Sequence, residues 1–258
     1  METLEVERDA RGVVTVTLSR PEVHNALSAQ MMDEVAEVAR RAAGDGTRAM
    51  VLTGAGTSFC AGGDLGWMRA QFEASAAERA GEGRRLAGML QALNAMPVPL
   101  IGRVQGAAYG GGVGLCCVCD VAVAAEGARF GLTETRLGLI PATIGPYVIA
   151  RIGEGLARRV FMSARRFDAA EARDLGVVAR VVPPEALDAA VEAEVAPYLA
   201  CAPGAVAEAK ALARALGPRI DAAAIDMSID ALVRRWEGEG AQEGVSAFFE
   251  KRKPGWAP

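Results

Sequence analysis

Two glycine-rich segments of the chain have the composition of strand-to-helix turns that expose backbone amides. TSFCAGGDL (57–65) follows the predicted strand AMVLTG, and GAAYGGGVG (106–114) follows the predicted strand VPLIGRV. Free N–H groups at a helix start point outward and bind anions. Two such turns side by side would hold one oxygen atom between two amides, which is an oxyanion hole. The alternative is that the glycines only let a helix and a sheet pack closely.

Other catalytic systems are disfavoured by what the sequence lacks. His24 is the single histidine and lies far along the chain from any serine in an elbow-like context. The absence of a Gly-Lys dipeptide excludes a Walker A phosphate loop, and no GxGxxG follows a predicted strand. No cluster of His, Cys or carboxylate residues indicates a metal site. Backbone amides and carboxylates remain as the chemical groups of the site.

The composition indicates a soluble, cytoplasmic protein with one large domain, or a core with an appendage. A chain of 258 residues with 51% hydrophobic residues can bury a sizeable core. The net charge of -4 argues against a nucleic-acid partner. No apolar run approaches the roughly 20 residues that span a bilayer, and the first residues lack the pattern of a signal peptide. The five cysteines are expected to be small buried residues, because their odd number and spacing do not suit a disulfide frame.

Hydrophobic periodicity predicts an α/β fold in layers with a helical tail. The predicted elements are a β-hairpin at 3–18, a helix at 28–44, strands at 49–54, 98–106 and 119–126, and a long helical region at 62–96. Ser28 is the expected N-cap of the first helix and Gly44 its stop. Residues 129–145 are too rich in Gly and Pro for one regular element. Helices dominate afterwards, and Pro183-Pro184 marks a boundary before the C-terminal helical region.

Four segments, in order, carry a resemblance to a known family. They are SRPEVHNALS, VLTGAGTSFCAGGDL, GAAYGGGVGLCCVCDVAVAAEGARFGLTETRLGLIP and AFFEKRKP. Together they resemble the enoyl-CoA hydratase/isomerase family, also called the crotonase superfamily. The resemblance implies a crotonase-like spiral of strand-strand-helix units at 1–195 and a helical C-terminal trimerisation region at 196–258, in a homotrimer or homohexamer. It also implies an acyl-CoA thioester substrate, with no cofactor beyond the coenzyme A that the substrate carries.

The same resemblance implies the catalytic groups. In the family two backbone N–H groups bind the thioester oxygen, and they match Gly63 and Gly111. Glu134 matches one of two glutamates of the hydratases and is predicted to act as a general acid/base, with a pKa raised by its apolar neighbours. Gly114 matches the other glutamate, so this chain lacks one of the two carboxylates that hydration ordinarily uses. One carboxylate suffices to move a proton between two carbons, or to dehydrate a substrate on one face.

Further residues are predicted to contact the substrate. The complete set of predicted substrate and CoA contacts is Ala61, Gly63, Asp64, Leu65, Gly66, Tyr109, Gly111, Phe248 and Lys251. Asp64 is equally suited to cap the next helix, and Tyr109 to pack against the pocket wall. Trp67 and Met68 are expected to line or cover the acyl cavity. Phe248 and Lys251 match family positions that contact the nucleotide end of CoA, often from a neighbouring subunit.

A finer resemblance concerns the substrate. FCAGGDLGWM and ETRLGLIPATIGPYVIARIG are similar to the bacterial methylglutaconyl-CoA hydratases of leucine and isovalerate breakdown, which interconvert 3-methylglutaconyl-CoA and 3-hydroxy-3-methylglutaryl-CoA. The distal carboxylate of such a substrate needs a cation, for which the candidates are Arg69, Arg84, Arg85 and Arg136. The alternatives are a Δ3-Δ2 enoyl-CoA isomerase, a non-catalytic CoA-thioester binder and an RNA-binding protein; the acidic net charge argues against the last.

Overall fold

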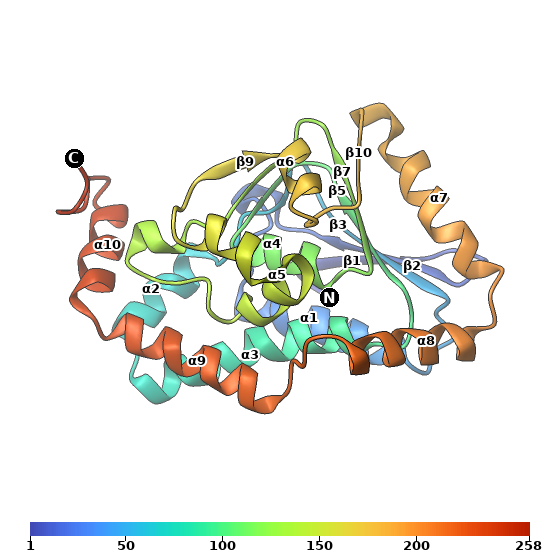
Figure 1. Cartoon of the computed structure of the whole chain (residues 1–258), viewed down its shortest axis with the longest axis horizontal. Coiled ribbons are helices and arrows are strands. Elements are labelled where there is room, and N and C mark those ends of the chain that lie inside the picture. The colour runs from blue at the N-terminus through green and yellow to red at the C-terminus, as the bar shows by residue number, and fades with distance from the viewer.

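The computed structural model describes all 258 residues and contains two β-sheets (Figure 1). The strands are β1 (Leu4–Arg8), β2 (Val13–Leu18), β3 (Ala49–Gly54), β4 (Ser58–Cys60), β5 (Leu100–Val104), β6 (Ala107–Tyr109), β7 (Val121–Ala125), β8 (Arg129–Gly131), β9 (Arg166–Asp168) and β10 (Arg180–Val182). The six-stranded sheet has the order β1-β2-β3-β5-β7-β10, and the four-stranded sheet has the order β4-β6-β8-β9. Neighbouring strands are parallel except in the β1–β2 and β8–β9 pairs.

Helices follow most pairs of strands and make up the C-terminal part of the chain. The α-helices are α1 (Ala29–Arg41), α2 (Leu65–Glu73), α3 (Ala76–Ala95), α4 (Gly111–Val118), α5 (Gly145–Phe161), α6 (Ala169–Asp174), α7 (Leu187–Leu199), α8 (Pro203–Leu216), α9 (Ala222–Trp236) and α10 (Glu239–Phe249). Short 3₁₀ helices are η1 (Pro21–Val23), η2 (Glu134–Leu137) and η3 (Pro184–Ala186). No helix of the protein has the length and apolar composition needed to cross a bilayer.

The chain passes repeatedly from the larger sheet to the smaller one and then into a helix. β3 leads to β4 and α2, β5 leads to β6 and α4, and β7 leads to β8 and, after η2, to α5. This repetition confirms the predicted spiral of strand-strand-helix units. Because β4, β6 and β8 are adjacent and parallel, the segments that leave their carboxyl ends lie together at one edge of the smaller sheet.

Most of the predicted elements are confirmed. The hairpin is β1-β2, and the Met31 N–H donates to the Ser28 hydroxyl at the start of α1. The helical region at 62–96 is divided into α2 and α3, because Ser75 forms a capping box with Glu78 and starts a new helix. The irregular stretch 129–145 contains two short regular elements, β8 and η2. α1 ends at Arg41, before Gly44 is reached.

The core lies on both faces of the larger sheet. On one face α7 packs Leu187, Val191 and Val195 against the strands. This helix runs from Leu187 to Leu199, and the predicted boundary between residues 195 and 196 therefore lies within it. Helices α8 and α9 continue in a row along the side of the molecule where α1 and α3 lie (Figure 1).

Four of the five cysteines are buried, as predicted: Cys60, Cys116, Cys117 and Cys119. The prediction is wrong for Cys201, which is exposed. The physical reason is its place two residues beyond the end of α7, where the chain has left the face of the sheet. Burial raises the pKa of the Cys60 thiol to about 12, which leaves this side chain an inert packing group.

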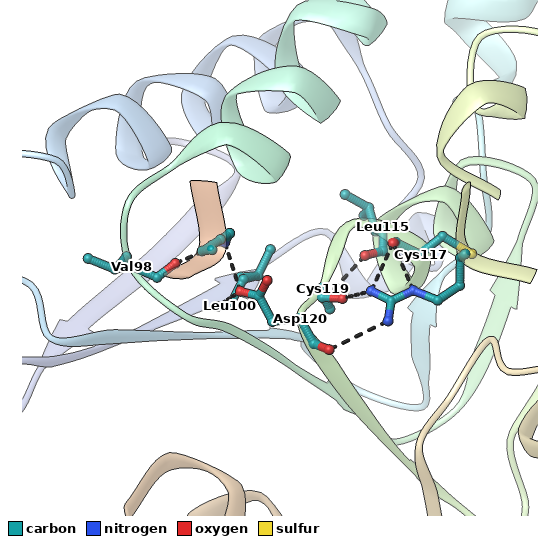
Figure 2. Close-up of polar contacts among 8 residues, drawn as sticks. Val98, Leu100, Leu115, Cys117, Cys119 and Asp120 are labelled. Atoms are coloured by element: carbon teal, nitrogen blue, oxygen red, sulfur yellow. Dashed lines mark hydrogen bonds and ion pairs between the residues drawn. The ribbon is translucent and has the colours of Figure 1, made fainter. Parts of the chain in front are cut away.

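An ion pair fastens α8 to the strands (Figure 2). The Lys210 Nζ lies 2.7 Å from the Asp120 Oδ2 and donates to the Val98 carbonyl at 3.0 Å. The Leu100 N–H donates to the same Asp120 oxygen at 2.7 Å. Both charged side chains are largely buried, with exposed fractions of 11% for Lys210 and 29% for Asp120. The pair therefore connects α8 to the start of β5 and to the segment that follows α4.

A second cation holds the carboxyl end of α4 (Figure 2). The Arg151 guanidinium, from α5, donates to the carbonyls of Cys117 and Cys119 and lies near that of Asp120. Positive charge at this end of a helix is favourable because the helix dipole is negative there. Arg151 thus fixes α4 at the end opposite to the glycine-rich N-terminus at Gly111.

We expect Lys210→Met to lower the free energy of unfolding by about 2 kcal/mol, because Asp120 would remain largely buried with one donor fewer. The matched control is Arg158→Met, which removes a pair with Glu154 whose side chains are 69% and 72% exposed. The control should change stability by less than about 0.5 kcal/mol. Urea denaturation followed by circular dichroism measures both, and equal shifts would contradict this account of the α8 attachment.

Candidate active site

A cavity of about 450 Å³ opens where the segments after β4, β6 and β8 meet. Its walls come from α1, the β4–α2 and β6–α4 turns, η2 with the following loop, and the C-terminal helices α9 and α10. A larger cavity of about 620 Å³ lies between α5 and α8, but its central charges, Lys210 and Asp120, already satisfy each other. The first cavity contains unpaired polar groups and is the candidate active site.

Two unpaired amides belong to turns that lie close together, since a Cβ built on Gly62 would lie 3.7 Å from the Gly111 nitrogen. Neither the Gly63 N–H nor the Gly111 N–H donates a hydrogen bond within the protein. Gly63 is held by a parallel bridge to Leu27, whose N–H donates to the Gly62 carbonyl at 2.7 Å. Gly111 begins α4, so its amide also carries the positive end of the helix dipole. Both residues line the cavity, where the two amides can bind one oxygen.

The glycines on either side of Gly111 are required by close contacts. Gly110 has a φ of +48°, and a Cβ built on it would lie 3.0 Å from the Glu134 Oε1. A Cβ on Gly112 would lie 2.3 Å from the Cys60 carbonyl oxygen. The glycines therefore serve both purposes: they let α4 pack closely against β4, and this close packing brings the Gly111 amide next to Gly63.

Glu134 is the carboxylate of this cavity. It starts η2, and its Oε2 is fully buried and has no hydrogen-bond partner in the protein. Burial raises the pKa of Glu134 to about 7, although a hydrogen bond from its own backbone opposes the shift. A carboxyl group with a pKa near neutrality can both accept and donate a proton at physiological pH.

The C-terminal helix of the same chain holds the segment that carries Glu134. Gly138 has a φ of +71°, and a Cβ built there would lie 2.0 Å from the Gly240 carbonyl oxygen. A Cβ on Gly244 would lie 2.4 Å from the Leu137 carbonyl carbon. Arg235 of α9 donates to the Gly138 carbonyl at 2.8 Å. Close backbone contact with α10 thus fixes the position of the η2 segment, and with it the Glu134 side chain.

An aliphatic side chain occupies the place next to Gly114. A Cβ built on Gly114 would lie 2.6 Å from the Ile144 Cγ2 and 3.0 Å from the Ile144 Cβ. Ile144 is 3% exposed and lines the cavity. A glutamate at position 114 would collide with Ile144, so Glu134 is the one carboxylate that lines this cavity.

The structure places most of the predicted contact residues on the cavity wall. Those that line it are Ala61, Gly63, Leu65, Tyr109, Gly111 and Phe248, together with Trp67 and Met68. Asp64, Gly66 and Lys251 are not among the lining residues. Lys251 follows α10 and is exposed.

Asp64 acts as the N-cap of α2. Its Oδ1 accepts hydrogen bonds from the Gly66 and Trp67 N–H groups, and its Oδ2 lies 2.9 Å from the Arg20 guanidinium. Partial burial opposes ionisation, but the bonds from Trp67 and Arg20 outweigh it and lower the pKa of Asp64. Asp64 is thus an ionised structural group beneath the Gly63 turn.

Three of the four candidate arginines are engaged elsewhere. Arg69 stacks over the Phe249 ring at 4.8 Å, Arg84 lies 4.0 Å from Asp226, and Arg85 pairs with Asp33 and Glu82. Only Arg136 of the four lines the cavity, and its guanidinium has no ion pair in the protein. It follows Glu134 by two residues in η2.

The sequence reasoning missed several lining residues. They include Met32, Leu86, Thr143, Ile144, Arg166, Leu232 and Trp236. Arg166 stacks over the Tyr109 ring at 5.2 Å, from β9 to β6, a pairing that no local pattern indicates. Thr143 lies in the motif IPATIG, where Pro141 signals a turn leading into the wall.

The matches to known proteins decide the family. Residues 8–258 match the sequence profile described as Enoyl-CoA hydratase/isomerase. The chain belongs to this family. A protein of Rhodobacter capsulatus named a probable enoyl-CoA hydratase is 35% identical over 258 residues, which cover 95% of this chain and 94% of that protein. The chain is accordingly a crotonase-superfamily enzyme with enoyl-CoA hydratase-like activity on acyl-CoA thioesters.

Solved structures of the family agree with the fold. A crystal structure of an enoyl-CoA hydratase from Mycobacterium avium superposes with a TM-score of 0.86 at 28% identity and covers the whole of both chains, 100% of each. One from Mycobacterium smegmatis has a TM-score of 0.80 at 38% identity and covers 98% of each chain. The predicted crotonase-like fold is therefore confirmed.

The raised pKa of Glu134 predicts a pH dependence for this hydratase-family enzyme. A general base must be ionised, and Glu134 binds a proton as the pH falls through its pKa of about 7. We expect kcat/KM to be constant well above that pH and to fall about tenfold per pH unit below it. Initial rates measured between pH 5 and 9 test this prediction. A fall in kcat/KM that begins only near the ordinary pKa of a glutamate would contradict the desolvation of Glu134.

Proposed function

We propose that this enzyme interconverts 3-methylglutaconyl-CoA and 3-hydroxy-3-methylglutaryl-CoA, as a hydratase/dehydratase of leucine breakdown. The observation that carries the proposal is the composition of the cavity: two free amides, one carboxylate with a pKa near 7, and Arg136, which unlike the other lining arginine, Arg166, is not stacked on a ring. The amides suit a thioester oxygen, the carboxylate suits an α-proton, and the arginine suits a second carboxylate on the substrate.

The dehydration runs through an enolate. The Gly63 and Gly111 N–H groups bind the thioester oxygen and stabilise the negative charge that forms when the Glu134 carboxylate removes the α-proton. The enolate then expels the 3-hydroxyl group, and the protonated Glu134 donates its proton to that oxygen, which leaves as water. The products are the enoyl thioester and water, and Glu134 returns to its ionised form. Hydration is the same sequence in reverse.

Arg136 supplies the contact with the distal carboxylate in this proposal. Arg136 and Glu134 lie on one short helix, η2, and both line the cavity. A charge-assisted hydrogen bond between a guanidinium and a carboxylate is worth about 2 kcal/mol, enough for a roughly 30-fold preference over an uncharged acyl chain.

The test is turnover of 3-hydroxy-3-methylglutaryl-CoA, crotonyl-CoA and a 3-enoyl-CoA by wild type, Arg136→Gln and, as a control, Arg158→Gln on the exposed side of α5. We expect the wild type to dehydrate 3-hydroxy-3-methylglutaryl-CoA, with kcat/KM about 30-fold lower in Arg136→Gln. Rates with crotonyl-CoA should be equal in all variants. Absence of turnover of the branched substrate by the wild type would overturn the proposal.

An enoyl-CoA isomerase is the second candidate, because the cavity offers one carboxylate and Ile144 occupies the place of another. A single base can carry a proton from C2 to C4 of a 3-enoyl thioester. Conversion of the 3-enoyl-CoA alone in the same assay would identify this activity, and binding without any turnover would indicate a CoA-thioester binder.

We also propose that the chain assembles as a homotrimer or a homohexamer through its C-terminal helices. The apolar side chains of Leu212 and Leu216 on α8 are 60% and 80% exposed, and that of Met227 on α9 is 68% exposed. Exposed large apolar groups of this kind favour burial against another subunit. Light scattering coupled to gel filtration measures the mass, and a monomeric mass would contradict the assembly.

A further inference from the structure

Two buried polar side-chain atoms of this protein lack any hydrogen-bond partner, and both belong to residues of the same cavity. They are the Glu134 Oε2 and the Thr143 Oγ1. Buried polar atoms are nearly always paired, so an unpaired one on the wall of a cavity indicates a group that a ligand satisfies. The acid/base role proposed for Glu134 accounts for its oxygen. It leaves the Thr143 hydroxyl unexplained.

The backbone holds Thr143 firmly in place. The Gly145 N–H donates to the Ala142 carbonyl at 2.8 Å, which makes Thr143 and Ile144 the central residues of a tight turn. α5 begins directly afterwards at Gly145. Thr143 itself is 4% exposed. Its hydroxyl therefore stands unpaired on a rigid segment and is not a mobile surface group.

The position of this turn indicates which part of the substrate the hydroxyl meets. Ile144, the next residue, packs against Gly114 in the first turns of α4, beyond the amide of Gly111 that faces the thioester oxygen. An acyl chain that extends from the thioester carbonyl along this wall of the cavity meets Thr143 and Ile144, which both line it. Thr143 thus brings a neutral donor and acceptor to the side of the cavity where Ile144 and Gly114 leave no carboxylate.

We propose that the Thr143 hydroxyl binds the oxygen atom on C3 of the substrate, which is the hydroxyl group of a 3-hydroxyacyl thioester or the water that adds to an enoyl thioester. The inference rests on the proposed hydratase/dehydratase function. The other polar parts of the substrate have their own partners, because the thioester oxygen meets two amides and a carboxylate meets Arg136. A neutral hydroxyl group is matched by another neutral hydroxyl group, which can both donate and accept a hydrogen bond.

The test compares binding of 3-hydroxybutyryl-CoA, as separate enantiomers, with binding of butyryl-CoA, which lacks only the C3 oxygen. Calorimetric titrations use the full-length protein carrying Glu134→Gln to prevent turnover, alone and combined with Thr143→Val or Thr143→Ser. Valine keeps the shape of threonine without the hydroxyl, and serine keeps the hydroxyl. Butyryl-CoA binding reports directly whether each variant retains an intact cavity.

We expect Thr143→Val to weaken binding of one 3-hydroxybutyryl-CoA enantiomer about tenfold and of butyryl-CoA by less than about twofold, with Thr143→Ser close to the parent. Equal weakening for both ligands, or none for either enantiomer, would overturn the assignment. Failure of the proposed function is recognised separately, because wild-type protein would then not dehydrate 3-hydroxy-3-methylglutaryl-CoA.

Discussion

Glu134→Gln is expected to lower kcat by about 10³-fold while leaving the affinity for a CoA thioester nearly unchanged. The amide has almost the shape of the carboxyl group, so the cavity and the two free amides of Gly63 and Gly111 persist. What is lost is the one group in the cavity that can take and return a proton near pH 7. A loss of this size in kcat alone is the pattern of a group that acts in the transition state.

Steady-state rates and a binding titration measure this effect. The matched control is Glu126→Gln, which alters an exposed glutamate after β7, outside the cavity. The control should retain full activity. Undiminished turnover by Glu134→Gln would mean that another group removes the proton, and an inactive wild type that still binds thioesters would support a binding protein.

Gly112→Ala is expected to lower kcat by about 10²- to 10³-fold, the loss typical of removing one oxyanion donor. The added Cβ would lie 2.3 Å from the Cys60 carbonyl oxygen, a backbone atom that cannot turn aside like a flexible side chain. Relief of that clash requires α4 and β4 to move apart. The movement separates the Gly63 and Gly111 amides, which then no longer meet at one oxygen.

The control for this substitution is Gly88→Ala, because Gly88 lies in α3 and a Cβ there would meet nothing within 4 Å. Alanine at that position should raise the free energy of unfolding by about 0.5–1 kcal/mol without affecting the rate. Thermal unfolding and initial rates are compared for both variants. A Gly112→Ala enzyme with normal kcat would show that the close contact of α4 with β4 is unnecessary for catalysis.

Local patterns in the sequence were sufficient to predict the long elements. The hairpin, the first helix with its Ser28 cap, and β3, β5 and β7 are each specified by periodicity or capping within a few residues. The division of the region at 62–96 was also readable, because the segment SAAE beginning at Ser75 has the spacing of a capping box.

Contacts between distant segments account for what was not predictable. The strands of the smaller sheet are each three residues long. Such short segments show no clear alternation of apolar and polar residues, and they are defined by their hydrogen bonds to neighbouring strands. The packing of Ile144 on Gly114, of Arg166 on Tyr109, and of α10 on η2 likewise joins segments far apart in the sequence. The resemblance supplied Glu134 and the two amides, but the unpaired hydroxyl of Thr143 became visible only in three dimensions.

The central claim is that Glu134 removes the α-proton of the bound thioester and that the amides of Gly63 and Gly111 stabilise the enolate that results. Deuterium exchange at the α-carbon tests it most directly, since incorporation requires the C–H bond to break whether or not water is then lost. The enzyme and a 3-hydroxyacyl-CoA are incubated in D₂O, and the recovered thioester is examined by mass spectrometry and NMR. The account predicts deuterium at the α-carbon with the wild type and none above background with Glu134→Gln. Absence of exchange with the wild type during turnover, or equal exchange by both proteins, would contradict it.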